Sequence, residues 1–326
     1  MGHLRRDRAL SRGNAGALAP PIRSAQREHH RGRPAADWPH VSCTFLVRAS
    51  ALHPMTEEPA VPLNMPLPQD LTAEWFDAIP RRISSRRYDG TSPASALLVR
   101  LEETCQRLAA PSGQSRAVLV REAPPEVFTG LIGSYGRVAD APSLVALVGA
   151  DNAGIEVGYI GEAVVLDATA VGIDSVWIAA AFDAGAAGRL TDLRDGERVH
   201  AIAALGHATK TIGAGERLMR AGVRARHRLP LDTIAPGHRD WPAWAREAAT
   251  AVRLAPSGAN KQPWRLHMDS GALVFTKAAK TYWTAPLDFG IAMLHAELGA
   301  MHMGVSGAWI VGSGAEVARF VPGPQA

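Results

Sequence analysis

Apolar residues recur along the chain with two different periods, and together these predict a protein built from both helices and strands. Spacing of three to four residues indicates amphipathic helices, whereas short runs rich in Val, Leu and Ala favour strands. From Leu71 onward the predicted elements are, in order, helices at 71–79 and 92–110, strands at 117–122 and 143–150, a helix at 161–172, and strands at 174–182 and 200–208. Ser92 is the expected N-cap of the second helix.

The pattern restarts after a polar linker at 234–240. The restarted elements are a helix at 241–255, strands at 264–269 and 272–277, a helix at 287–304 and a strand at 307–312. A Pro-Ser-Gly turn follows the first helix in both series, at 111–113 and 256–258. Gly172 and Gly304 are suited to left-handed helix caps, and each precedes a tryptophan by five residues. The repetition indicates two related half-units in one chain, comparable to a fused dimer.

Three segments follow from this pattern. Residues 1–64 form a basic extension without a sustained hydrophobic period, which we predict to be disordered, and Met55 or Met65 is an alternative start. Residues 65–235 form the first unit and residues 236–326 the second, shortened unit. The fold class predicted from this mixture is α+β.

The overall basic character, with a pI of 9.4, belongs to one end of the chain. Residues 1–54 contain nine arginines and three acidic residues, so the remainder carries a slight negative charge. We therefore expect no nucleic-acid partner, although a nucleic-acid binder acting through residues 1–54 is an alternative. Retention of nucleic-acid binding by a chain that starts at Leu71 would exclude that alternative.

Two further features bear on location. The most apolar run is interrupted by Asp167 and Asp174, so we expect no membrane span. Cys43 and Cys105 lack the spacing of a metal site or a disulfide framework, and we expect a cytoplasmic protein without a bound metal.

Four motifs in fixed order resemble a known family. They are RRISSRRYDG at 81–90, a Gly-Glu helix followed by Gly-x-x-x-x-Trp at 161–177, RHRLPLD at 226–232, and PSGANKQPW at 256–264. Together they resemble the FMN-dependent nitroreductases, in particular a tandem branch in which one polypeptide imitates the usual homodimer. The resemblance implies a nitroreductase-like fold, with mixed or antiparallel sheets flanked by helices and two half-units related by a pseudo-twofold axis.

The resemblance also implies which residues bind the flavin. The residues it assigns to the phosphate and ribityl chain are Arg82, Ser84 and Arg86 on one side and Arg226 and Arg228 on the other. Arginine suits this role because its planar fork donates two parallel hydrogen bonds to a phosphate. An isolated arginine-rich run would more often be a solvated surface, and two such runs in the family's two phosphate positions favour the binding interpretation.

The isoalloxazine ring is assigned to other segments. Pro256, Ser257, Gly258 and Asn260 are expected to meet its pyrimidine edge, although a Pro-Ser-Gly sequence is also an ordinary turn. Arg137 resembles the family's basic residue near N1 and the C2 carbonyl, or is a surface arginine. Ala180 and Ala181 stand where many members have Glu-Gly beside N5, which places the donor and substrate preference in question.

The activity implied by the family is ping-pong hydride transfer from NAD(P)H through flavin N5 to a small-molecule acceptor, such as a nitroaromatic compound or a quinone. Flavin N5 carries this chemistry, so no catalytic side chain is required. The repeat implies a monomer with an internal pseudo-dimer. An alternative function is a non-catalytic flavin-binding or flavin-storage protein.

Overall fold

The computed structural model describes residues 61–63, 65, 67–109, 114–128, 138–209, 227–279, 282, 284–312 and 314–324. They lie in one compact unit, Met55–Ala326. The helices are α1 (Thr72–Ala78), α2 (Ser95–Arg107), α3 (Gly154–Ala170), α4 (Ala184–Arg189), α6 (Leu231–Ile234), α7 (Ala243–Leu254) and α8 (Ala285–His302). The strands are β1 (Val61–Leu63), β2 (Ser115–Val120), β3 (Ser143–Ala150), β4 (Asp174–Ile178), β5 (Glu197–Gly206), β6 (Trp264–Asp269), β7 (Ala272–Lys277), β8 (Gly307–Val311) and β9 (Glu316–Pro322).

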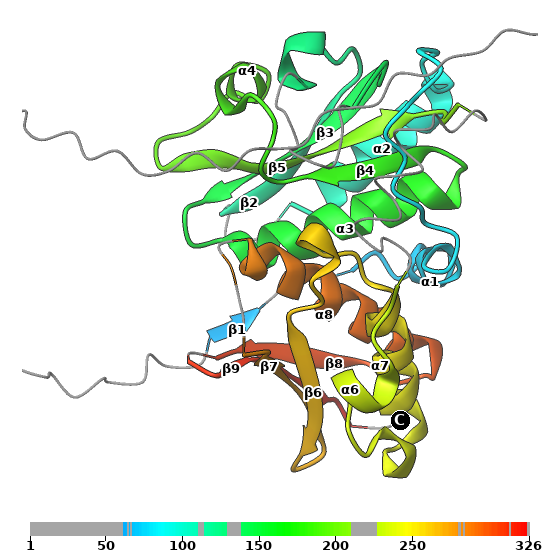
Figure 1. The fold of residues 1–326 in the computed structure, drawn as a ribbon, viewed down its shortest axis with the longest axis vertical. Helices are drawn as coiled ribbons and strands as arrows, with labels where there is room; N and C mark the ends of the chain where they lie inside the picture. Colours follow the sequence, from blue (N-terminus) through cyan, green and yellow to red (C-terminus); the bar gives the residue numbers. More distant parts are fainter. Residues whose placement is uncertain are drawn as a thin grey trace, which may run out of the picture. The chain divides into compact units, whose positions relative to one another are not determined.

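The strands form two antiparallel sheets, and α3 and α8 lie between them (Figure 1). One sheet has the order β2-β3-β5-β4 and the other the order β1-β8-β9-β7-β6. The series α2, β2, β3, α3, β4, β5 recurs as α7, β6, β7, α8, β8, β9, and strands at equivalent places in the two series have the same neighbours. The predicted α+β class with antiparallel sheets and flanking helices is confirmed.

The two middle helices are apolar on almost every side, which is typical of helices enclosed by protein. No helix among the described residues is both long and apolar enough to cross a membrane. Strand β3 is buried along nearly its whole length because it lies between β2 and β5 and is covered on both faces. The expected cap at Ser92 is wrong, since α2 begins at Ser95 and its N-cap is Ala94, two residues beyond Ser92 and directly after Pro93.

Helices α3 and α8 cross at two glycines. A Cβ atom added to Gly158 would lie 2.1 Å from the Leu287 carbonyl oxygen, and one added to Gly290 would lie 1.9 Å from the Ile155 carbonyl oxygen. The two contacts are reciprocal, because Gly158 and Gly290 are separated along the chain by the same interval as Ile155 and Leu287. Only glycine permits backbones to approach this closely.

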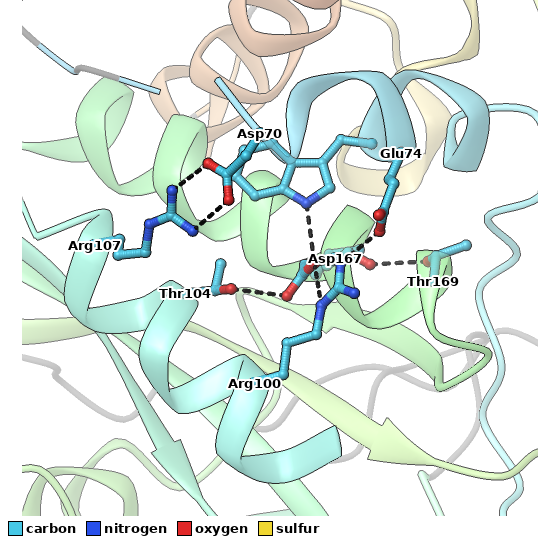
Figure 2. A network of polar contacts seen from close by, with 9 residues as sticks. Asp70, Glu74, Arg100, Thr104, Arg107, Asp167 and Thr169 are labelled. Atoms are coloured by element: carbon cyan, nitrogen blue, oxygen red, sulfur yellow. Dashed lines mark hydrogen bonds and ion pairs between the residues drawn. The ribbon is translucent and has the colours of Figure 1, made fainter. Parts of the chain in front are cut away.

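A fully buried carboxylate, Asp167 on α3, joins this helix to its neighbours (Figure 2). Its oxygens accept hydrogen bonds from Trp75 Nε1 at 3.1 Å, from Thr104 Oγ1 at 2.8 Å and from Arg100 Nη2 at 2.7 Å. Arg100 also contacts Glu74. Because each donor comes from α1 or α2, the network fixes both helices on α3 and compensates the burial of the charge.

The folded part begins earlier than the sequence pattern indicated. Val61–Leu63 lies within the predicted extension 1–64, but it forms strand β1 and pairs with β8 in antiparallel register. Three residues that include a proline carry no local strand signal, so the pairing with β8 decides their conformation. Residues 1–60 lie outside the described part of the chain.

We predict that Gly290→Ala lowers the free energy of unfolding by about 3 kcal/mol, the upper end of the usual range for overpacking. The added methyl would meet the Ile155 backbone, which cannot move without separating the helices. Urea denaturation measures the change. Gly188→Ala is the matched control, because its methyl would meet only the end of the Leu193 side chain. Equal stability of the two variants would contradict the close crossing.

Candidate functional site

A cavity of about 320 Å³ lies where the end of β4, the turn before β6 and the start of α8 meet. It brings together predicted residues that are far apart in the sequence. Those that line it are Arg82, Ser84, Arg86, Ala180, Ala181, Arg228, Pro256, Ser257, Gly258 and Asn260. Arg137 and Arg226 lie outside the described residues. The grouping agrees with a shared site, and the flavin-binding role of each residue stays a prediction.

The arginine-rich segment is held beside β4. Ser84 forms a parallel bridge to Ser175, and the Ser85 amide donates to the Ser175 carbonyl at 2.9 Å. These contacts extend the sheet by one short segment at the edge of β4. The alternation along this segment places Arg82, Ser84 and Arg86 on the cavity wall.

Arg82 is nearly enclosed, with 5% of its side chain exposed. Its Nε lies 3.6 Å from Oε1 of Glu162 and has no hydrogen-bond partner among the described residues. Burial lowers the pKa of Arg82, and the charge of Glu162 opposes that shift. A buried donor without an acceptor is costly, so this nitrogen is suited to an incoming anion.

Glu162 links the two halves of the molecule. Its Oε2 accepts from Trp177 Nε1 at 2.7 Å, and its Oε1 lies 3.0 Å from Nε2 of His295 on α8. The other ring nitrogen, Nδ1, lies 3.0 Å from the Ala251 carbonyl oxygen and therefore carries a proton. Glu162 therefore contacts Trp177, His295 and Arg82 together, and it joins α3 to α8 beside the cavity wall.

Arg228 adds a second buried cation. Its guanidinium donates to Oδ1 of Asn260 and, at 3.0 Å, to the Leu254 carbonyl oxygen. Burial, together with the positive charge of Arg82, lowers the pKa of Arg228 to about 10. Among the described residues that line the cavity, Arg82, Arg86 and Arg228 face a single carboxyl group, Asp288. An anion is the complementary ligand.

The turn that carries Asn260 is strained. Ala259, Asn260 and Gln262 have positive φ angles of 51°, 53° and 49°. Left-handed residues other than glycine cost about 1–2 kcal/mol each, and they persist where the surroundings hold them. Gln262 supplies much of that restraint. Its backbone N–H donates to Ser257 Oγ at 2.9 Å, and its side-chain Oε1 accepts from the Leu229 backbone N–H at 2.9 Å. The second bond also fixes the segment that carries Arg228.

A carboxyl group closes the opposite wall. Asp288, in the first turn of α8, is 3% exposed, and its Oδ1 accepts from the Gly258 N–H at 2.9 Å. The Tyr282 hydroxyl lies 2.7 Å from its Oδ2. Burial raises the pKa of Asp288 to about 7, against the opposing influence of the two hydrogen bonds. A Cβ at position 258 would lie 3.0 Å from Thr284 Oγ1, so glycine is the residue that fits this corner.

Comparison with known proteins assigns the chain to a family. A profile described as "Putative TM nitroreductase" matches residues 74–300. The chain belongs to this nitroreductase family. No curated protein shows significant similarity to it.

Several solved structures are similar to the chain. A putative nitroreductase from Thermotoga maritima MSB8 is 20% identical, with a TM-score of 0.50, over 77% of this chain and 94% of that one. A nitroreductase with bound FMN from Bacteroides fragilis is 20% identical, with a TM-score of 0.34, over 44% and 96% of the two chains. A putative NADH oxidase from Clostridium acetobutylicum is 15% identical, with a TM-score of 0.33, over 41% and 89%. The first of these supports the fold of this family member.

Sequence reasoning missed several residues of the site. Glu162 belongs to the Gly-Glu motif at 161–177, but it was predicted to have no role of its own. Asp288, Tyr282 and His295 were also assigned no role. One signal could have found the two carboxylates: each is an acidic residue inside an otherwise apolar helix, where a charge needs a specific partner. Among the residues that the structure describes, no group of three His, Cys, Asp or Glu side chains is arranged to hold a metal ion.

The raised pKa of Asp288 predicts a pH dependence of stability. Between about pH 4 and pH 7 the folded protein keeps a proton on Asp288 that the unfolded chain has lost, so the free energy of unfolding falls as pH rises. Asp288→Asn removes this contribution. Relative to the wild type, we expect the variant to gain on the order of 4 kcal/mol between pH 4 and pH 8. Urea titrations at several pH values measure it, and a pH-independent difference would contradict the protonated carboxyl.

Proposed function

We propose that the chain is an FMN-dependent NAD(P)H oxidoreductase of the nitroreductase type, in the cytoplasm, that reduces nitroaromatic or quinone-like acceptors. Its membership in the nitroreductase family gives the oxidoreductase class. The observation that carries the proposal is the convergence of Arg82, Arg86 and Arg228 with the 256–260 turn on one cavity.

The residues present fit FMN. A phosphate dianion complements the surplus positive charge, and the buried Nε of Arg82 supplies a donor that lacks a protein acceptor among the described residues. The cavity of about 320 Å³ lies at the lower end of the range for small-molecule sites. Arg82, Ser84, Arg86 and Arg228 would hold the phosphate and ribityl chain. The strained turn would present Asn260 and backbone amides to the ring.

When bound, FMN supplies hydride transfer through N5 between NAD(P)H and the acceptor. The chain's own contribution is binding and orientation. Glu162 and His295 keep Arg82 in place, and Gln262 keeps Arg228 and the turn in register. Ala180 and Ala181 leave that part of the wall without a charged side chain.

A non-catalytic flavin-binding protein is the second candidate. Ala180 and Ala181 favour it, because they provide no acidic side chain for contact with a substrate. Consumption of NADH or NADPH in the presence of menadione separates the two functions. Steady turnover supports the oxidoreductase, and tight FMN binding without turnover supports the second candidate.

We predict that Arg82→Ala or Arg228→Ala weakens FMN affinity by about 1.5–3 kcal/mol, the range for hydrogen bonds to charged groups. This corresponds to about tenfold to a hundredfold in Kd. The cause is the loss of a fixed partner for the phosphate, and fluorescence titration of the apo-protein with FMN measures it. Arg116→Ala is the control, because Arg116 pairs with Glu197 and does not line the cavity. Unchanged affinity in both cavity variants would refute the phosphate assignment.

A second part of the proposal is that one chain binds one FMN without a partner chain. The recurrence of helices and strands in the same order supports a pseudo-dimer. A smaller cavity of about 210 Å³ lies between the start of β8, the second half of α8 and residues 63–69. The described residues that line it include Glu297 and Trp309 but no Arg, Lys or His. A phosphate would find no cationic partner there.

We therefore expect Asn260→Ala to reduce FMN content, whereas Gln114→Ala, in the corresponding upstream turn, leaves it unchanged. Asn260 fixes the turn through a bond from its Nδ2 to the His227 carbonyl oxygen at 2.8 Å, in addition to its contact with Arg228. Released FMN per chain is measured by absorbance after denaturation. Two FMN per chain, or equal loss in both variants, would show that the single-site proposal is wrong.

A further inference from the structure

Asp288 is a buried acid on the wall of the cavity, and flavin binding alone does not explain it. No Lys, Arg or His of the described residues forms an ion pair with it, and no basic side chain contributes to its pKa. Its contacts are instead with one backbone amide and one hydroxyl group. A carboxyl group in this setting is more stable with its proton than without it.

The hydrogen bonds around Asp288 also indicate a proton. The Tyr282 hydroxyl lies 2.7 Å from Oδ2 of Asp288 and 2.9 Å from the Gly258 carbonyl oxygen. If Asp288 were ionised, both of these oxygens would be acceptors competing for the single hydroxyl proton. If Asp288 is protonated, it donates to the hydroxyl and the hydroxyl donates to the carbonyl. The second arrangement makes both contacts hydrogen bonds.

Tyr282 extends this chain of donors to the ligand. Both Asp288 and Tyr282 line the cavity, on the wall formed by the start of α8. Because a hydroxyl both accepts and donates, Tyr282 can turn its proton from the Gly258 carbonyl oxygen to a molecule in the cavity and take the proton of Asp288 as it releases its own. The pair therefore provides a route for one proton from a buried acid to a molecule in the cavity.

We propose that Asp288 is the proton donor for the acceptor and that the Tyr282 hydroxyl relays the proton to the acceptor's oxygen. This inference rests on the proposed function. A quinone that receives a hydride gains two electrons and one hydrogen, and it needs one further proton to become a hydroquinone. The O–H bond of Asp288 breaks as a new O–H bond forms on Tyr282, whose own proton passes to the acceptor oxygen. Asp288 is left as a carboxylate and regains a proton from water.

Other charged groups share the cavity with this pair. Arg82, Arg86 and Arg228 line its wall, and they are the groups assigned to the FMN phosphate. On α3, which packs against α8, Glu162 is committed to Arg82, Trp177 and His295. Tyr282 is the titratable side chain in direct contact with Asp288. The change of charge near neutral pH on this wall is therefore assigned to Asp288.

Glu297 offers a matched control. It is also a buried acid on α8, it accepts from Tyr159 and Trp309, and burial raises its pKa to about 7. It lies beside the smaller cavity and does not line the first one. Glu297→Gln therefore removes a comparable carboxyl group without touching the proposed relay.

The first experiment uses apo-protein and infrared spectroscopy. We expect a carboxylic-acid C=O band from Asp288 that disappears as pH rises through about 7. Because Glu297 contributes a similar band, the Asp288 band is the intensity that Asp288→Asn removes, and this intensity should remain in Glu297→Gln and in Tyr282→Phe. If the spectra of the wild type and Asp288→Asn agree at pH 5.5, Asp288 holds no proton and the proposal is overturned. This result does not depend on FMN.

The second experiment uses FMN-loaded protein, reduced with dithionite and mixed with menadione. Wild-type reoxidation should slow about tenfold per pH unit above the pKa of Asp288, because only the protonated acid can donate. Asp288→Asn and Tyr282→Phe should be about 10²-fold slower at pH 6, with Asp288→Asn independent of pH. Glu297→Gln should follow the wild type.

The outcomes separate the two proposals. Wild-type protein that binds no FMN would overturn both the proposed function and the transfer of a proton from Asp288 to the acceptor. The infrared spectra would still decide whether Asp288 holds a proton. FMN binding and turnover with the same pH profile in the wild type and Asp288→Asn would leave the proposed function intact and overturn the proton donor.

Discussion

The close crossing of α3 and α8 is the constraint on which the rest of the structure depends. At Gly158 and Gly290 the two backbones meet without intervening side chains. Gly158 faces the Leu287 carbonyl, and Gly290 faces the Ile155 carbonyl. Contact at this distance leaves the two helices little room to shift relative to each other. The sheet that contains β3 lies on the outer side of α3, and the sheet that contains β7 lies on the outer side of α8. The contact between the two helices therefore sets the separation of the sheets.

This crossing also explains why polar residues occur inside apolar helices. Glu162 on α3 meets His295 on α8, and Glu297 on α8 meets Tyr159 on α3. Each glutamate accepts in addition from a tryptophan of the strand that follows its own helix. The two arrangements are similar in form, but among the arginines that the structure describes, one lies beside Glu162 and none beside Glu297. The difference in charge arises at the sheet edges: residues 82–86 lie along β4, whereas β1 occupies the edge of β8.

Much of the fold could be predicted from the sequence because its signals are local. The period of apolar residues located the helices and most strands, and the glycines before Trp177 and Trp309 do take left-handed φ angles of 83° and 74°. Strand β1 could not be predicted, since its conformation depends on pairing with β8, far away in the sequence. The motif resemblance predicted a shared site for Arg82, Arg228 and Asn260, which line one cavity. The surroundings of Asp288 and His295 depend on which residues of other segments face α8. Spacing along one helix does not contain that information.

The hydrogen bond between Arg228 and Asn260 has a consequence for how a ligand enters. Both side chains are already held by protein partners. To bind the proposed flavin, each would have to exchange one of these partners for the ligand. Binding is then an exchange of partners, in which little conformational entropy is lost because the rotamers are restrained beforehand. The net affinity depends on the difference between the bonds given up and the bonds formed. A site of this kind favours ligands that satisfy the arginine and the asparagine together, and it discriminates against simple anions that can engage only the arginine.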